Sequence, residues 1–252
     1  MKENLDSDGV RKELEAELQA RDEFFSAIAH ELRNPLNALH LTLAGLLRAQ
    51  GGATPLNSEQ LVARLNRAST QVSRLAKLVD DMLDVSRISA GRLVLQMEDF
   101  DASAVLSEVV EKSKDPANAG QITLSMPDSM VIRGDRSRFA NIASNLVSNA
   151  IMYGNQQPIE VRLTPDPSTI RLEVADHGIG IAAADQERIF ERFVKLDQGS
   201  QNVRFGIGLW VTRAVVLALD GEISVTSEPE RGSTFVVKLP KLRLTGAAAP
   251  SG

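Results

Sequence analysis

The sequence predicts an α+β protein in which an N-terminal helical hairpin precedes an α/β sandwich, with one sheet covered by helices. Two observations carry this prediction. Apolar residues recur at alternating spacings of three and four over the first part of the chain, which is the period of packed helices. Beyond about residue 95, short β-like runs alternate with helical segments. The length of 252 residues suits two modest domains.

A heptad seam defines the predicted hairpin. It runs from Leu14 to Leu46 in the first helix and returns from Leu61 to Met82 in the second. The segment between them, QGGATPLNS, is rich in turn-forming residues, so the two helices should lie antiparallel. One such pair leaves apolar surface uncovered. We therefore expect a second copy to complete a four-helix bundle, which makes the protein a homodimer.

Turn-rich segments divide the second half of the chain. The β-like runs are QITLSM, IEVRLT, TIRLEVAD, EISVTS and STFVVKLP, and the helical segments lie around residues 135–153, 184–193 and 208–219. The expected divisions of the chain are an incoming coiled-coil helix at 1–22, the hairpin domain at 23–92, a linker at 93–102, the sandwich domain at 103–242 and a disordered tail at 243–252.

Charge and composition exclude several classes of function. A formal net charge of −5 and a pI near 5.4 argue against a general polyanion binder, so we expect no nucleic-acid partner. The chain has no cysteine, which excludes disulfides, thiolate nucleophiles and cysteine-ligated metals. No apolar run approaches the roughly 18 residues that a membrane helix needs. We expect a cytoplasmic chain without membrane contact of its own, any membrane tether lying upstream.

The stretch FFSAIAHELRNPLNALH places a titratable pair beside a helix breaker. In the heptad frame His30 falls on the outward face, where a solvated imidazole is a competent nucleophile toward a phosphoryl group. Glu31 can accept a proton from one ring nitrogen, and Asn34 projects from the same face one turn later. Pro35 is either a tolerated kink or a bend that directs the helix below the nucleophile. A solvated surface histidine is the alternative interpretation of His30.

The run NIASNLVSNA aligns three amides along one helix face. Asn141, Asn145 and Asn149 are spaced four residues apart, although asparagine is a poor residue for a helix interior. An amide carbonyl is a hard oxygen donor that suits Mg²⁺ bridging phosphates, and we predict this role chiefly for Asn149. A polar surface stripe is the alternative interpretation.

The run VADHGIGI ends a predicted strand with a carboxylate and two glycines. Asp176 can accept a hydrogen bond from an exocyclic amine such as that of adenine. Gly178 and Gly180 allow a tight turn and a close approach of the backbone to a ligand. Neither a GxGxxG nor a GxxxxGK[ST] phosphate loop occurs in the chain.

The run RFGIGLW supplies a second glycine pair at the start of a predicted helix. Gly206 and Gly208 leave backbone amides free there, and the helix dipole favours phosphate oxygens. The preceding polar segment carries Lys195 and Arg204, which are available to anionic phosphates. Each glycine pair alone is a weak signal, whereas the ordered set is a strong one.

With these motifs, the chain resembles the catalytic core of the two-component sensor histidine kinases over nearly its whole length. AHELRNPL matches the family's phospho-acceptor box, NLVSNAIMYG its N box, DHGIGI its first glycine box, IFERFV its F box and GIGLW its second glycine box, with GSTF at the last turn. The resemblance implies a dimerisation and histidine-phosphotransfer hairpin joined to an ATP-binding sandwich of the Bergerat type.

The resemblance also implies roles in the hairpin. His30 would be the phosphorylated residue and Glu31 its acid–base partner, while Asn34 would serve when the kinase dephosphorylates its response regulator.

In the sandwich, the resemblance implies a site for ATP and Mg²⁺. Asn149 would ligate Mg²⁺ with Asn145 nearby, and Asp176 would read adenine. The remaining residues of the implied ATP-binding set are Tyr153, Gly178, Gly180, Lys195, Arg204, Gly206, Gly208 and Leu209.

The function that these motifs predict is ATP-dependent autophosphorylation on His30, followed by transfer to an aspartate on the receiver domain of a response regulator and accompanied by phosphatase activity. Met152 and Trp210 depart from the family pattern. They motivate an alternative, a phosphatase-dominant or degenerate kinase that acts as a dimeric signalling scaffold. ATPases and chaperones of the gyrase, MutL and heat-shock types share the nucleotide-binding superfamily but lack the His30 box.

Overall fold

The computed structural model divides the chain into two compact units, Met1–Asp84 and Val85–Gly252. The residues that it describes are 26, 28–29, 32–49, 57–114, 121–192, 194 and 207–241. The described part of the first unit is helical, and the second unit contains strands and helices. The predicted order, a helical hairpin followed by an α/β sandwich, is confirmed.

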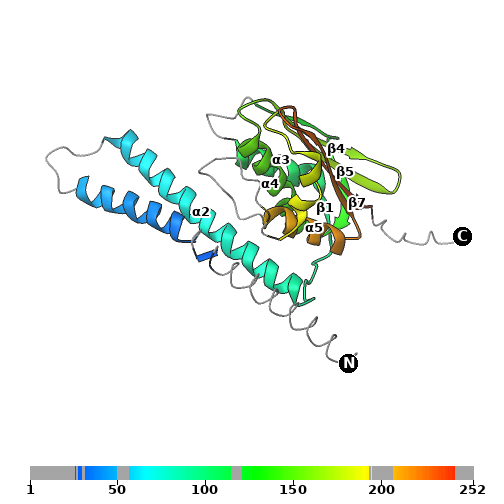
Figure 1. Ribbon diagram of the computed structural model, residues 1–252, viewed down its shortest axis with the longest axis horizontal. Coiled ribbons are helices and arrows are strands. Elements are labelled where there is room, and N and C mark those ends of the chain that lie inside the picture. The colour runs from blue at the N-terminus through cyan, green and yellow to red at the C-terminus, as the bar shows by residue number, and fades with distance from the viewer. Residues whose placement is uncertain are drawn as a thin grey trace, which may run out of the picture. The chain divides into compact units, whose positions relative to one another are not determined.

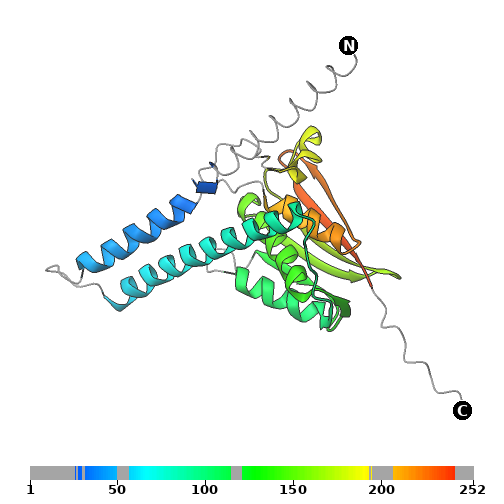
Figure 2. The same ribbon diagram turned by 90° about the horizontal axis from the view of Figure 1, so that it is seen from below.

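The first unit is a hairpin of two helices that lie side by side in both views (Figures 1 and 2). Residues 32–49 form one helix, and α2, Ser58–Ser89, forms the other. A reciprocal capping box begins α2. The Gln60 N–H donates to the Asn57 side chain at 2.8 Å, and the Asn57 N–H donates to the Gln60 side chain at 3.3 Å.

The apolar positions of α2 form two rows that differ in exposure. The inner row, with residues seven apart, is buried or partly covered and consists of Ala68, Leu75 and Met82. The outer row has the same spacing, and about half of each side chain is exposed: Leu65 (49%), Val72 (52%) and Val79 (47%). The first helix has exposed leucines too, at Leu36, Leu43 and Leu47. The single chain therefore leaves apolar surface on the hairpin uncovered.

The second unit is built on a five-stranded sheet with strand order β2-β4-β5-β7-β6. The strands are β2 (Ile122–Ser125), β4 (Ile159–Pro165), β5 (Thr169–Ala175), β6 (Glu222–Glu228) and β7 (Gly232–Pro240). β2 pairs in parallel with β4, whereas the other neighbouring pairs are antiparallel. Each strand matches one of the β-like runs of the sequence to within one residue at either end.

Three helices cover one face of this sheet (Figure 1): α3 (Ala102–Ser113), α4 (Arg136–Tyr153) and α5 (Gly208–Ala218). Between the helices and the sheet lies the core. Its largest fully buried side chains include Phe139, Leu106, Ile142, Leu146, Leu163, Ile170 and Leu172. Removal of these apolar surfaces from water holds the two layers together.

The opposite face of the sheet carries charged side chains. The guanidinium of Arg162 lies 3.1 Å from a carboxylate oxygen of Glu173, and that of Arg171 lies 2.9 Å from the other oxygen. Lys238 and Glu222 pair across β7 and β6 at 3.3 Å. This division into an apolar face and a charged face is expected of a sheet that is covered on one side only.

Three elements lie outside the predicted runs. One is α3, and the other two are strands β1 (Glu98–Asp101) and β3 (Val131–Gly134), which pair antiparallel as a separate two-stranded sheet. β1 falls within the range predicted as a linker, so part of that range is strand. Asp101 ends β1 and caps α3, because its carboxylate accepts the Ser103 N–H at 2.9 Å.

The helix predicted around residues 184–193 is wrong. The chain forms two short 3₁₀ turns there, η1 (Ala183–Asp185) and η2 (Arg188–Phe190), and neither has a side-chain N-cap. The buried residues Ile189 and Phe190 are adjacent in sequence. An amphipathic α-helix needs buried residues three and four apart, whereas among residues 184–192 the structure buries only these two neighbours.

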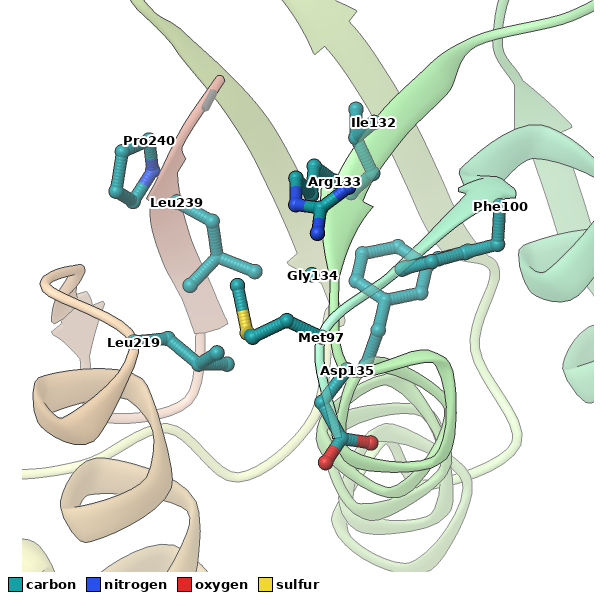
Figure 3. Close-up of a pocket in the computed structure, with 10 residues that line it drawn as sticks. Met97, Phe100, Ile132, Arg133, Gly134, Asp135, Leu219, Leu239 and Pro240 are labelled. Carbon is teal, nitrogen blue, oxygen red and sulfur yellow. The ribbon is translucent and has the colours of Figure 1, made fainter. Parts of the chain in front are cut away.

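Asp135 joins the start of α4 to the segment that enters β1. One carboxylate oxygen caps α4 by accepting the Arg138 N–H at 3.0 Å. The other accepts the Gln96 N–H at 2.9 Å. The next side chain, Met97, projects toward Leu219 in a small apolar pocket beside this carboxylate (Figure 3). The segment that leads into β1 is thus fixed by a hydrogen bond at Gln96 and by apolar packing at Met97.

Candidate functional site

Asp176 follows directly after β5 and is only 6% exposed. Its N–H donates to the Ser233 carbonyl at 2.9 Å and its carbonyl accepts the Ser233 N–H at 3.2 Å, which extends the pairing of β5 with β7. Its carboxylate accepts the Gly178 N–H at 2.9 Å. Burial raises the pKa of Asp176, although hydrogen bonds from Gly178 and Ser233 and the charge of His177 oppose this effect. A carboxylate offers about four acceptor positions, so this one can receive a further amine donor.

The turn after Asp176 requires glycine because protein backbone occupies the space of a side chain. A Cβ at Gly178 would lie 1.8 Å from the carbonyl oxygen of Tyr153, at the end of α4. Gly180 has a φ of +66°, and a Cβ there would lie 1.9 Å from the carbonyl oxygen of Glu228. The predicted tight turn is present. Its glycines bring it against α4 on one side and the hairpin of β6 and β7 on the other.

Asn145 ties the middle of α4 to the first turns of α5. The side chain is 5% exposed, and its Nδ2 donates to the Thr212 hydroxyl oxygen at 2.8 Å. Its Oδ1 lies on the Gly208 side, where a Cβ would come within 2.6 Å of it. The amide therefore lies across Gly208 and Thr212, which are one helical turn apart on α5. Glycine at the start of α5 allows this approach.

Asn149 lies between the two contacts that α4 makes. Asn145, Asn149 and Tyr153 follow one another at four-residue intervals, so they share one face of α4 over a length of about 12 Å. Asn149 is partly buried, and Tyr153 is 38% exposed. Asn141, the first amide of the row, is exposed. The three predicted amides are thus regularly placed but lie in three different environments.

The first turn of α5 has the features of an anion-binding helix end. The helix begins at Gly208, and the preceding Ile207 provides no side-chain cap. Helical hydrogen bonding starts with the Val211 N–H, which donates to the Ile207 carbonyl at 2.8 Å. The N–H groups before Val211 are those that a helix leaves without an internal partner, and they favour a phosphate or another anion. The predicted residue Leu209, partly buried, lies in this turn.

Some predicted site residues lie outside the described part of the chain: His30, Glu31, Lys195, Arg204 and Gly206. Of the predicted hairpin residues, Asn34 is described, and it is exposed on the helix of residues 32–49.

Thr212 and Ser233 are site residues that the sequence analysis did not single out. Ser233 belongs to the GSTF motif, which the structure places at the start of β7, and its backbone pairing with Asp176 follows from the register of β5 with β7. Thr212 reaches Asn145 across 67 residues of sequence. The spacing of four residues between Gly208 and Thr212 could have indicated this role, because residues at that spacing share a helix face.

Within the described ranges, no group of three or more His, Asp or Glu side chains could hold a metal ion. In the same part of the chain, no helix is both long enough and apolar enough to cross a bilayer.

The fold and the site define an ATPase-type α/β domain preceded by a helical hairpin. Comparison with known proteins supports this class. Residues 20–91 match the family of the His Kinase A (phospho-acceptor) domain, and residues 134–243 match the histidine kinase-, DNA gyrase B- and HSP90-like ATPase family. The sensor-like histidine kinase SenX3 of Mycobacterium tuberculosis is 32% identical over 228 residues, which cover 88% of this chain. They cover 54% of SenX3, so the chain spans about half the length of this relative.

Two solved structures resemble the chain in sequence and fold. The histidine kinase AdeS of Acinetobacter baumannii is 27% identical with a TM-score of 0.59, over 85% of this chain and 98% of that one. Full-length ShkA, solved in complex with AMPPNP, is 27% identical with a TM-score of 0.60, over 86% of this chain and 45% of that one. The chain belongs to the sensor histidine kinases and contains the catalytic core of that family, a phospho-acceptor domain followed by an ATPase domain.

Proposed function

We propose that this chain is an ATP-dependent kinase that phosphorylates itself on His30 and passes the phosphoryl group to an aspartate of a response-regulator receiver domain. The arrangement along α4 is the observation that supports this proposal most. Asn149 lies between a contact with the first turn of α5, at Asn145, and a contact with the Asp176 turn, at Tyr153. The face of α4 that carries Asn149 is thus bordered by the Asp176 turn at one end and by the N-terminus of α5 at the other.

The residues present fit a purine nucleotide and its metal ion. When bound, ATP supplies the γ-phosphoryl group and Mg²⁺ neutralises charge on the phosphate oxygens. The Asp176 carboxylate would accept a hydrogen bond from the amine of adenine, and Asn149 would offer an amide oxygen to Mg²⁺. The first turn of α5 would donate backbone N–H groups to phosphate oxygens. The other residues that we propose to contact the nucleotide are Asn145, Tyr153, Gly178, Gly180, Lys195, Arg204, Gly206, Gly208 and Leu209.

His30 is the proposed nucleophile. A bond forms between its ring nitrogen and the γ-phosphorus while the bond to the bridging oxygen breaks, and ADP leaves with that electron pair. Glu31 takes the proton of the imidazole. In the second transfer, a carboxylate oxygen of the receiver's aspartate displaces the imidazole, which restores His30. Because ATP and receiver domains are found in the cytoplasm, we propose that this core works there.

The hairpin is the proposed dimerisation surface. The outer row of Leu65, Val72 and Val79 is about half exposed in the single chain. Packing of this row against a second copy would bury it in a four-helix bundle and remove the apolar surface from water. We propose a homodimer on this ground.

Phosphatase activity toward the phosphorylated receiver is the finer part of the proposal. The exposed Asn34 lies one turn beyond His30, so its amide is available to a water molecule or to a phosphoryl oxygen of a docked partner. The alternative remains a phosphatase-dominant or degenerate kinase that acts as a dimeric scaffold.

Radiolabelled Mg-ATP tests the proposal. The wild-type chain should acquire label that acid removes and base does not, and His30→Gln should abolish it. His40→Gln is the matched control, because His40 is an exposed histidine of the same hairpin. Label that persists in the His30→Gln variant would sink the proposed mechanism. Nucleotide binding without any label on wild-type His30 would favour the scaffold.

A further inference from the structure

Two arginine–aromatic contacts join η2 to α5 in reciprocal fashion. The guanidinium carbon of Arg192, just after η2, lies 4.4 Å from the ring centroid of Trp210 on α5. The guanidinium carbon of Arg213 on α5 lies 5.7 Å from the ring centroid of Phe190 in η2. Each segment therefore supplies one cation and one ring. Both distances are within the range in which a guanidinium is attracted to an aromatic face.

The η2 side of this arrangement is anchored in the core. Phe190 is 6% exposed, and its ring meets that of Phe235 on β7 edge to face, with centroids 6.4 Å apart. Such an arrangement is a favoured geometry for aromatic pairs. η2 is thus fixed to the sheet, and its contacts with α5 are made from a rigid base.

Helix geometry separates the Trp210 side of α5 from its α4 side. Residues two apart on a helix point about 200° apart, so Trp210 and Gly208 lie on nearly opposite sides. Gly208 faces Asn145 of α4. The indole therefore lies away from the contact between α4 and α5, against Arg192. The first turn of α5 is held from α4 on one side and from η2 on the other.

We infer that the stack of Arg192 on Trp210 positions the first turn of α5 for the phosphate groups of a bound nucleotide. This inference rests on the proposed function. It assigns Trp210 a positioning role, since the indole stacks away from the site instead of filling it. Loss of the stack should loosen one of the two supports of the helix end and weaken nucleotide binding, without removing any group that touches the nucleotide.

Trp210 is the single tryptophan of the chain, so its fluorescence reports on the stack directly. The first measurement is the emission of the nucleotide-free wild-type chain against Arg192→Ala. We expect a change in intensity or emission maximum in the variant, because the cation leaves the ring. Arg188→Ala is the matched control: Arg188 belongs to η2 and pairs with Asp185 at 2.7 Å, not with the indole. Its spectrum should match that of the wild type.

The second measurement is the dissociation constant of Mg-AMPPNP, titrated against each full-length variant with a calorimeter. Arg192→Ala should raise the constant about two- to fivefold, the equivalent of an exposed cation–π contact. Arg192→Lys should restore part of the affinity, because it keeps a cation over the ring, and Arg188→Ala should bind as wild type does. Thermal unfolding of all four proteins shows that each is folded; Arg192→Ala should lose a little stability, because it removes the stack and the hydrogen bond from Arg192 to the Ser89 hydroxyl at 3.1 Å.

An unchanged constant in Arg192→Ala would overturn the inference, as would equal weakening by Arg188→Ala or identical emission spectra. None of these three results contradicts the proposed kinase activity, since the wild-type chain would still bind the nucleotide. Failure of the wild-type chain to bind Mg-AMPPNP at all would overturn the proposed function together with this inference.

Discussion

The carboxylate of Asp135 accepts a hydrogen bond from the backbone N–H of Gln96 at 2.9 Å, across 39 residues of sequence. The same side chain caps α4 through the Arg138 N–H. Burial raises the pKa of Asp135, but hydrogen bonds from Gln96, Arg138 and Ser137 and the charge of Arg138 outweigh it, so the pKa lies below its ordinary value. One residue therefore both begins the helix that carries Asn145 and Asn149 and fixes the chain that enters β1.

Asp135→Ala should lower the free energy of unfolding of the second unit by about 2 kcal/mol, because it removes a helix cap and leaves the Gln96 N–H without its acceptor. Asp135→Ser should lose less, since its hydroxyl can cap α4 but is too short to reach both partners. Urea unfolding followed by circular dichroism measures both. Equal losses in the two variants would show that the cap contributes nothing.

The stabilisation by Asp135 should depend on pH in a fixed direction. Because its pKa is lower in the folded state than in the unfolded chain, the stabilisation is present above the unfolded value of about 3.9 and is lost as pH falls through the folded value. The difference in stability between wild type and Asp135→Ala should therefore be constant near neutral pH and shrink in acid. Unfolding curves at several pH values between neutrality and acid check this.

Asp176→Asn should separate binding from stability. The raised pKa means that burial of the charged carboxylate costs folding energy at neutral pH, so the variant should unfold at a higher temperature than wild type. The gain should vanish in acid below the unfolded pKa, where both states of the wild type are protonated. Affinity for Mg-AMPPNP should fall roughly tenfold or more. The amide oxygen of asparagine would keep the hydrogen bond from Gly178, and the amide nitrogen in place of the second carboxylate oxygen cannot accept a hydrogen bond from the amine of adenine. A destabilised variant would contradict the assigned cost of burial.

Thr212→Val should cost about 1–3 kcal/mol of stability, because the buried amide of Asn145 loses its hydrogen-bond acceptor. Thr212→Ser keeps the hydroxyl and is the matched control. Chemical unfolding of the two variants measures the difference. Valine that is tolerated as well as serine would mean that the hydrogen bond between α4 and α5 adds no stability.

Val72→Glu should weaken the proposed homodimer, because it places a charge in the middle of the outer row. We expect the dimer dissociation constant to rise by roughly a factor of ten or more, from a desolvation cost above about 1.4 kcal/mol. Thr70→Glu adds the same charge at an exposed position about 200° away around α2 and should leave the constant unchanged. Analytical ultracentrifugation distinguishes them. A monomeric wild type would refute the dimer.

Periodicity predicted the hairpin, the five strands of the main sheet and the helices α4 and α5, but it missed α3, although that helix has twelve residues. β4 and β5 alternate apolar and polar residues along nearly their whole length, and α4 repeats its apolar residues over eighteen positions. β1 and β3 have four residues each, and β1 reads EDFD, with three charges around one buried phenylalanine. Such a strand is defined by its partner, not by its own pattern.

The candidate site also has parts that the sequence predicts and parts that depend on tertiary packing. Asp176 with its glycines and the first turn of α5 are encoded by short contiguous motifs, so the sequence could predict them. The contact of Asn145 with Thr212 depends on how α4 packs against α5, and no local pattern contains that information. Trp210 illustrates the limit. As a departure from the family pattern it motivated a degenerate kinase, whereas the structure directs its ring toward Arg192.

The charged face of the five-stranded sheet bears on how copies of this protein meet. Arg162 pairs with Glu173 across β4 and β5, Arg171 pairs with Glu173 along β5, and Lys238 pairs with Glu222 across β7 and β6. Two such faces could stack only by stripping water from every charge, whereas the outer row on α2 loses little on contact. The sheet face therefore offers a second copy less favourable contact than the outer row on α2 does, so we expect copies to meet through the hairpin.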